Sequence, residues 1–165
     1  LVLIVAATLT VNVLAFFEGT LEAVVRLSLF IPLLIGTGGN AGSQASTVVI
    51  RAMAVGEVRF GDLPRIIWRE ARVGILLGGM LAGASFPIVG FIFGWDFATV
   101  ISLTLVAICT WASFAGGMLP VLAKRLGIDP AVISAPLIST LVDATGLIIY
   151  FTIARIVLIE HFMGL

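Results

Sequence analysis

Charged residues are scarce in this chain, and their scarcity excludes most soluble proteins. Only 11% of the 165 residues are Asp, Glu, Lys or Arg, whereas 61% are hydrophobic. A soluble domain of this size needs far more charge to cover its surface. The nine basic residues are scattered and are balanced by nine acidic ones, so no basic face is available to bind nucleic acid. The composition therefore predicts an integral membrane protein.

Cysteine and histidine are nearly absent, which excludes the common disulfide, metal and catalytic frameworks. The single Cys109 cannot form an intrachain disulfide or a cysteine metal cage, and its apolar neighbours favour an inert packing role. His161 is the only histidine, and the sequence contains neither a Ser-His-Asp arrangement nor an HExxH motif. We therefore expect that the protein is not an enzyme.

The sequence also has no initiator methionine and no polar segment before its first apolar run. The basic stretch that opens a secretory signal peptide is missing as well. We therefore expect residues 1–165 to be one transmembrane domain that belongs to a longer protein.

In contrast to these scarce features, long apolar runs are abundant in the chain. Five can be drawn, at residues 1–17, 23–50, 73–93, 98–120 and 131–159. Each is long enough for a helical span of about 20 residues. Backbone polar groups in lipid must be satisfied within a segment, and alternating ten-residue strands are absent, so the runs predict helices. We expect an all-α integral membrane protein with five transmembrane helices, and a short amphipathic helix after Pro64 with Asp62 near its cap.

The distribution of basic residues predicts the orientation of these helices. The loops after the second and fourth runs hold or adjoin most of the basic side chains: Arg51, Arg59, Arg65, Arg69, Arg72, Lys124 and Arg125. The other two loops carry Glu18, Glu22 and Asp96 but neither Lys nor Arg. The positive-inside rule then predicts a multi-pass protein of the cell inner membrane, with a cytoplasmic N-terminus and an external C-terminus.

Asp143 is an acid in the middle of the last apolar run. At ~1.5 Å per residue it lies roughly 18 Å from Ala131, near the centre of a hydrocarbon layer about 30 Å thick. A lone charge there costs about 2.5–3.5 kcal/mol, so we expect it to have a function. The alternative is neutralisation by an arginine. Arg155 lies too far along the same helix for that, and Arg26 is explained by snorkelling or by Glu22 four residues before it.

Small and polar residues share the helical spacing of Asp143. They are Pro136, Ser139, Thr140, Gly146 and Tyr150. Pro136 also removes a helical hydrogen bond to the carbonyl near Val132, which leaves an acceptor free. Carboxylate, hydroxyl and carbonyl oxygens are the ligands of a hard cation.

A second polar stretch, residues 32–47 (PLLIGTGGNAGSQAST), lies within the second run. It contains four glycines, Asn40, Gln44 and several hydroxyls, which are costly in lipid unless something packs closely or water reaches them. One interpretation is that Gly38 and Gly42 only allow close helix packing. The other, which we favour, is that this helix lines a pore. One helix can serve both roles.

At these two stretches the chain resembles the membrane domain of the MgtE magnesium channels and transporters. The resemblance rests on residues 32–58 (PLLIGTGGNAGSQASTVVIRAMAVGEV), 127–137 (GIDPAVISAPL) and 139–151 (STLVDATGLIIYF). It implies a homodimer whose central pore is lined mainly by the second and fifth spans. It also implies that residues 1–165 form the pore domain, and that the family's N-terminal cytosolic regulatory domains, which are absent from this chain, are partners of it.

The resemblance also assigns site residues. Asp143 would recognise Mg²⁺ on the pore axis, and the pore face would include Gly39, Asn40, Ser43 and Ser139. Ser43 departs from the pattern, because the resemblance implies an amide at that position.

Three functions stay open at this point. The first is a channel that passes hydrated Mg²⁺ into the cytoplasm down its electrochemical gradient. The second is a proton- or sodium-coupled secondary transporter of divalent cations that uses Asp143 as its coupling site. The third is a dimerising membrane anchor that transports nothing. In each transport function Mg²⁺ is a substrate, and oxygen ligands would also accept manganese or cobalt ions.

Overall fold

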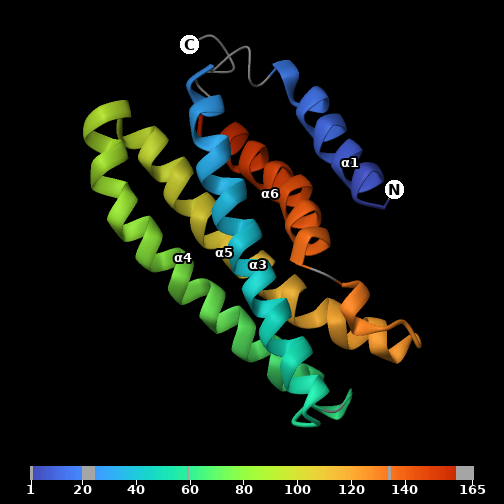
Figure 1. Cartoon of the computed structure of the whole chain (residues 1–165). Helices are drawn as coiled ribbons and strands as arrows, with labels where there is room; N and C mark the ends of the chain where they lie inside the picture. The colour runs from blue at the N-terminus through green and yellow to red at the C-terminus, as the bar shows by residue number, and fades with distance from the viewer. Residues whose placement is uncertain (1, 20–24, 59, 134, 159–165) are drawn as a thin grey trace.

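Helices account for all the regular structure of the described residues in a computed structural model of the chain (Figure 1), and these residues are 2–19, 25–58, 60–133 and 135–158. In chain order the elements are α1 (Val2–Phe16), the 3-10 helix η1 (Val25–Phe30), α3 (Ile31–Ala54), the 3-10 helix η2 (Phe60–Asp62), α4 (Leu63–Phe93), α5 (Trp95–Arg125), the 3-10 helix η3 (Pro130–Val132) and α6 (Ala135–Val157). No strand occurs in these ranges, which confirms the predicted all-α class.

Three helices of the described part of the chain are long and apolar enough to cross a membrane, namely α4, α5 and α6. α1 is apolar but shorter. α3 has 24 residues, or about 36 Å at 1.5 Å per residue, but its glycines, amides and hydroxyls lower its hydropathy. The helices thus agree with a membrane protein, and the number of five spans stays a prediction.

α5 lies at the centre of the bundle. α3, α4 and α6 all pack against it, and α1 packs against α6 (Figure 1). Many α5 side chains are therefore buried, and Val100, Ile101 and Ile108 are almost completely covered. α3 and α4 both rest on α5 but scarcely touch each other. The flank of α3 that faces α6 is therefore packed against another helix, whereas the flank that faces α4 is not.

Glycines bring α4 close to α5. A methyl group added at Gly74 or Gly78 would lie 2.6 Å from backbone atoms of α5, so no larger residue fits there without movement. Nothing lies within 4 Å of such a group at Gly79 or Gly83. Of these four glycines, Gly74 and Gly78 thus serve packing, whereas Gly79 and Gly83 face open space.

The helix before the third apolar run is not a separate element, contrary to the prediction. α4 begins at Leu63, with Pro64 in its first turn, and continues to Phe93 without a break. Proline is tolerated at this end because the first backbone N–H groups of a helix have no helical partner. Asp62 takes the N-cap position, as predicted, but its side chain makes no capping hydrogen bond and forms a 3.6 Å ion pair with Arg65.

Two other prolines also differ from expectation. Pro120 lies inside α5, which continues to Arg125 instead of ending near residue 120. Pro136 is the second residue of α6, so no helical hydrogen bond existed there to be removed. Val132 belongs to η3, so its carbonyl lies before α6 and not within the last membrane helix, contrary to the prediction. Within the described part of the last apolar run, the α-helix covers Ala135–Val157, and residues 131–132 belong to η3.

Most of the basic residues in the described ranges lie toward one end of the bundle, where α3 and α5 end and α4 begins (Figure 1). Arg51 lies in the last turn of α3, and Lys124 and Arg125 close α5. At the opposite end, Gly94 joins α4 directly to α5 with φ +103°. Arg59, Glu22 and His161 lie outside the described residues. Which end faces the cytoplasm stays a prediction.

Candidate functional site

α3 and α6 meet at Gly39, where the facing α6 residues are Ser139 and Asp143. A methyl group added at Gly39 would lie 2.5 Å from the Ser139 Oγ and 3.4 Å from the Asp143 Oδ1. Ser139 and Asp143 are four residues apart, so they share one face of α6. The structure thus brings together three residues that the sequence analysis assigned to the site.

Ser43 extends this contact by one helical turn. It lies four residues after Gly39 on α3, and its hydroxyl donates a 3.1 Å hydrogen bond to the Ala135 carbonyl at the start of α6. Ala135 in turn precedes Ser139 by four residues, so the two helices run antiparallel here. Asn40 lies beside this contact with its side chain exposed, and none of the described hydrogen bonds involves it. Four of the five predicted site residues therefore lie along the α3–α6 contact, and Asn40 borders it.

Asp143 forms no ion pair with a described residue. Its side chain is half-buried, and neither Arg65–Asp62 nor Arg69–Glu70 involves it. Arg155 lies over the ring of Phe17, 4.9 Å from its centroid. Neutralisation of Asp143 by an arginine of the described chain, the alternative left open by the sequence, is therefore wrong.

The polar face of α6 is narrower than its helical spacing predicted. Tyr150 is fully buried, and its hydroxyl donates a 2.9 Å hydrogen bond to the Leu27 carbonyl. Gly146 is buried against Ile108 of α5. Both residues thus face the interior of the bundle and not the α3–α6 contact.

Gly38 and Gly42 pack the helices together and do not face Asp143. A methyl group at Gly38 would meet Ile108 and Val142, and one at Gly42 would lie 3.0 Å from an Ile138 methyl. The packing interpretation is confirmed for Gly38 and Gly42, and pore lining by this helix stays a prediction. Gly38 and Gly42 serve packing, while Gly39 adjoins the carboxylate.

One contact beside Asp143 is not evident from the sequence. The indole N–H of Trp111 on α5 donates a 2.8 Å hydrogen bond to the Thr145 Oγ1, two residues after Asp143. Thr145 in turn donates to the Leu141 carbonyl at 2.8 Å. The only signal in the sequence was that a tryptophan inside an apolar run needs a partner for its N–H group. The bond helps to fix the rotation of α6 and hence the direction of Asp143.

The donor atoms at this contact suit a hydrated cation better than a bare one. Within the described ranges, no three His, Cys, Asp or Glu side chains come close enough to hold a metal ion. One chain thus offers one carboxylate together with hydroxyl and carbonyl oxygens. Mg²⁺ releases its water reluctantly and is often bound through that water by one or two carboxylates.

Comparison with known proteins is consistent with this chemistry. The model of the MgtE family, described as "Divalent cation transporter", matches residues 31–153. A magnesium transporter MgtE from Thermus thermophilus is 44% identical over 161 residues, which cover 95% of this chain and 35% of the relative. Relatives of the same name are 34% identical in Enterococcus faecalis and 35% identical in Bacillus subtilis over 149 residues each, covering 88% and 87% of the chain and 32% of each relative. The chain spans about a third of the length of these curated relatives.

Proposed function

The chain belongs to the MgtE family of divalent cation transporters, and on that premise we propose that it forms a Mg²⁺-conducting path through a membrane. The observation that supports this most directly is that Asp143, which forms no ion pair within the described ranges, lies beside Ser139 and the bare backbone of Gly39. A carboxylate within an apolar helix costs about 2.5–3.5 kcal/mol unless a partner or water compensates it. A permeating divalent cation is such a partner.

The path is completed by a second identical subunit. One Asp143 supplies a single negative charge, whereas two related by a twofold axis supply the two that balance Mg²⁺. Gly39, Asn40, Ser43 and Ser139 would then line the pore with Asp143, as the family resemblance implies. In this arrangement α3 and α6 of each subunit form the wall, and α5 supports them from behind.

The proposed mechanism is passive conduction of the hydrated ion. Direct coordination would strip water that Mg²⁺ holds tightly, so the site oxygens contact its water shell instead. The larger and more flexible shell of Ca²⁺ fits such spacing less well. For a double charge, a membrane potential of 100 mV contributes about 4.6 kcal/mol, which is enough to drive entry without a coupled ion. The basic end of the bundle faces the cytoplasm in this proposal.

Replacement of Asp143 tests the proposal. Asp143→Asn removes the charge and keeps the shape, so Mg²⁺ uptake by full-length protein in liposomes at a fixed membrane potential should fall at least tenfold. Asp96→Asn is the matched control, because Asp96 is an exposed carboxylate at the end of the bundle. Its uptake should equal that of the parent.

Two results would contradict the proposal. Parental uptake by both Asp143→Asn and Asp143→Ala would show that the carboxylate is not needed. Uptake that follows an imposed pH or sodium gradient and ignores the membrane potential would identify a coupled transporter in place of a channel.

A further inference from the structure

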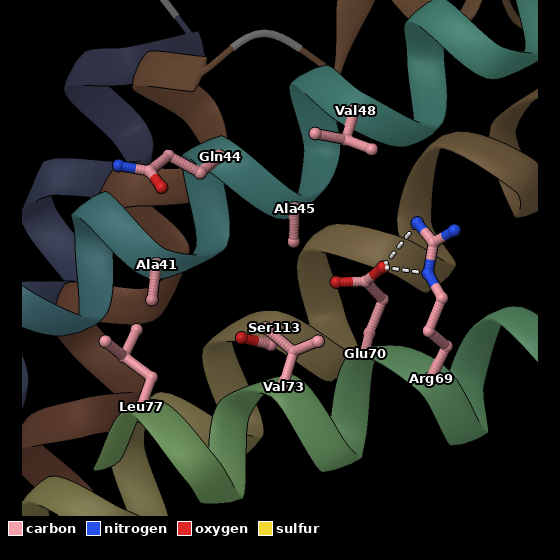
Figure 2. Close-up of a pocket in the computed structure, with 9 residues that line it drawn as sticks. All are labelled: Ala41, Gln44, Ala45, Val48, Arg69, Glu70, Val73, Leu77 and Ser113. Carbon is pink, nitrogen blue, oxygen red and sulfur yellow. Dashed lines mark hydrogen bonds and ion pairs between the residues drawn. The ribbon is translucent and has the colours of Figure 1, made fainter. Parts of the chain in front are cut away.

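A groove lies between α3 and α4, on the flank of α3 that faces away from Asp143. It forms because both helices pack on α5 and scarcely on each other, so that α5 makes its floor. The cavity measures about 300 Å³, at the lower end of the roughly 300–1,000 Å³ typical of ligand pockets. Figure 2 shows the residues that line it, which are Ala41, Gln44, Ala45, Val48, Arg69, Glu70, Val73, Leu77 and Ser113.

The polar end of the groove is built around a buried carboxylate. The Glu70 side chain is only 6% exposed, and its Cγ packs against Gly117 of α5. The guanidinium of Arg69 donates two hydrogen bonds, of 3.0 and 3.2 Å, and both go to the Glu70 Oε1. The second oxygen, Oε2, accepts no hydrogen bond from any described residue and points into the space between α3 and α4 (Figure 2).

Arg69 presents the opposite charge at the mouth of the same groove. Its side chain is 60% exposed, and only two of its five N–H donors are used by Glu70. The groove thus offers a free carboxylate oxygen inside and free guanidinium donors at its edge. A ligand that carries an ammonium group next to a phosphate matches both.

Apart from Gln44 and Ser113, the rest of the groove is apolar, and it opens to the side of the bundle. Val48 and Val73 form its walls and are each about half exposed, and Leu77 continues the wall along α4. Glu70 lies seven residues into the 31-residue α4, or roughly 10 Å from its end. Because α4 is about 46 Å long and the hydrocarbon layer about 30 Å thick, this is the depth at which headgroups meet acyl chains.

We propose that the groove between α3 and α4 binds a phospholipid with a primary-amine headgroup, such as phosphatidylethanolamine. Its ammonium group donates to the Glu70 Oε2, its phosphate accepts from Arg69, and an acyl chain lies along Val73 and Leu77. Phosphatidylcholine has the same charges but no N–H to donate. Phosphatidylglycerol has a phosphate but no cation for Glu70.

The headgroup dependence of lipid binding tests this proposal. The full-length protein is equilibrated in detergent with equal amounts of phosphatidylethanolamine, phosphatidylcholine and phosphatidylglycerol that share the same acyl chains. Retained lipids are then counted by native mass spectrometry. The parent should retain phosphatidylethanolamine over phosphatidylcholine by about tenfold, the factor expected for one charge-assisted hydrogen bond.

Three variants separate the parts of the site. Glu70→Gln should abolish the preference for phosphatidylethanolamine over phosphatidylcholine, and Arg69→Gln should lower the retention of all three lipids. Val73→Trp fills the groove at a half-exposed position and keeps both charges, so it should expel every lipid even if the Glu70 variant fails to fold. Glu57→Gln is the control, because Glu57 is an exposed carboxylate at the same end of the bundle, and it should keep the preference.

Several outcomes would overturn the proposal. Equal retention of the three lipids by the parent would show that no headgroup is recognised, as would happen if a second copy of the chain covered the groove. Loss of phosphatidylethanolamine on addition of millimolar Mg²⁺ would identify the Glu70 carboxylate as a cation site instead. An unchanged preference in Glu70→Gln would place the bound lipid elsewhere on the protein.

Discussion

At Gly39 the lack of a side chain allows Ser139 and Asp143 to stand directly against the backbone of α3. Gly39→Ala places a methyl group 2.5 Å from the Ser139 Oγ, so the serine or the helix must move. We expect Mg²⁺ uptake in liposomes to fall at least fivefold, while the thermal stability of the protein changes little, because the hydroxyl can rotate away.

Gly36→Ala is the control for this substitution. It lies on the same helix, three residues earlier, and has nothing within 4 Å of the added methyl group. Both variants change the intrinsic helix preference alike, by about 1 kcal/mol in favour of alanine. Equal uptake by the two variants would mean that the contact with Ser139 and Asp143 has no part in conduction.

The pattern of residues around Asp143 could be predicted only in part. The intramembrane acid, the glycine stretch and their helices follow from the sequence. The side of α6 that faces α3 cannot be predicted from the sequence, because Gly146 and Tyr150 share the helical spacing of Asp143. The structure assigns them to the interior because Ile108 fills the space beside Gly146 and the Leu27 carbonyl accepts the Tyr150 hydroxyl. Both partners are distant in sequence, so helical periodicity could not reveal them.

At the scale of helices, two adjacent glycines of α4 differ in their surroundings, because Gly78 packs against α5 and Gly79 does not. Gly78→Ala would place a methyl group 2.6 Å from the Val106 Cα, whereas Gly79→Ala meets nothing within 4 Å. We expect the first variant to destabilise the protein by about 1–3 kcal/mol, the usual cost of overpacking. The second should be neutral or up to about 1 kcal/mol more stable.

Thermal unfolding in detergent measures this pair of variants. Because the two glycines are neighbours, the depth in the membrane and the effect on the unfolded chain are nearly the same for both. A loss of stability of equal size in the two variants would contradict the observed packing of α4 on α5.

Helix boundaries were less predictable than helix existence, and prolines explain much of the difference. A proline disfavours the helical conformation of the residue before it, so Pro64 and Pro120 suggested boundaries. Pro64 falls in the first turn of α4, where a proline costs little. Pro120 lies inside α5, where packing against the surrounding helices stabilises the helical conformation. The arginines after Pro64 suggested a surface segment, yet they continue α4 beyond the apolar run.

At the scale of the whole molecule, the proposed dimer makes a geometric prediction. Asn40 is exposed beside the contact of α3 with α6, and in a twofold-symmetric pore it would face its own copy. Asn40→Cys, in a Cys109→Ala background that removes the one thiol of residues 1–165, should therefore form a disulfide-linked dimer under mild oxidation in membranes. Non-reducing electrophoresis measures the yield, which should exceed half of the protein.

Leu76→Cys is the matched control, because Leu76 is 66% exposed on α4, away from α3 and α6. It should stay monomeric under the same oxidation. Cross-linking of Leu76→Cys in preference to Asn40→Cys would place the subunit interface on α4 and would exclude a pore between the α3 helices.

The meeting of α3 with α6 also has a consequence for biosynthesis. Gly39 and Asp143 lie roughly a hundred positions apart, whereas α4 and α5 are neighbours joined through Gly94. Local contacts form early, and the N-terminal part of a chain leaves the ribosome first. The hairpin of α4 and α5 can therefore assemble before the glycine face of α3 makes its contact with α6. A chain interrupted before α6 would fold much of its bundle and still have no cation site.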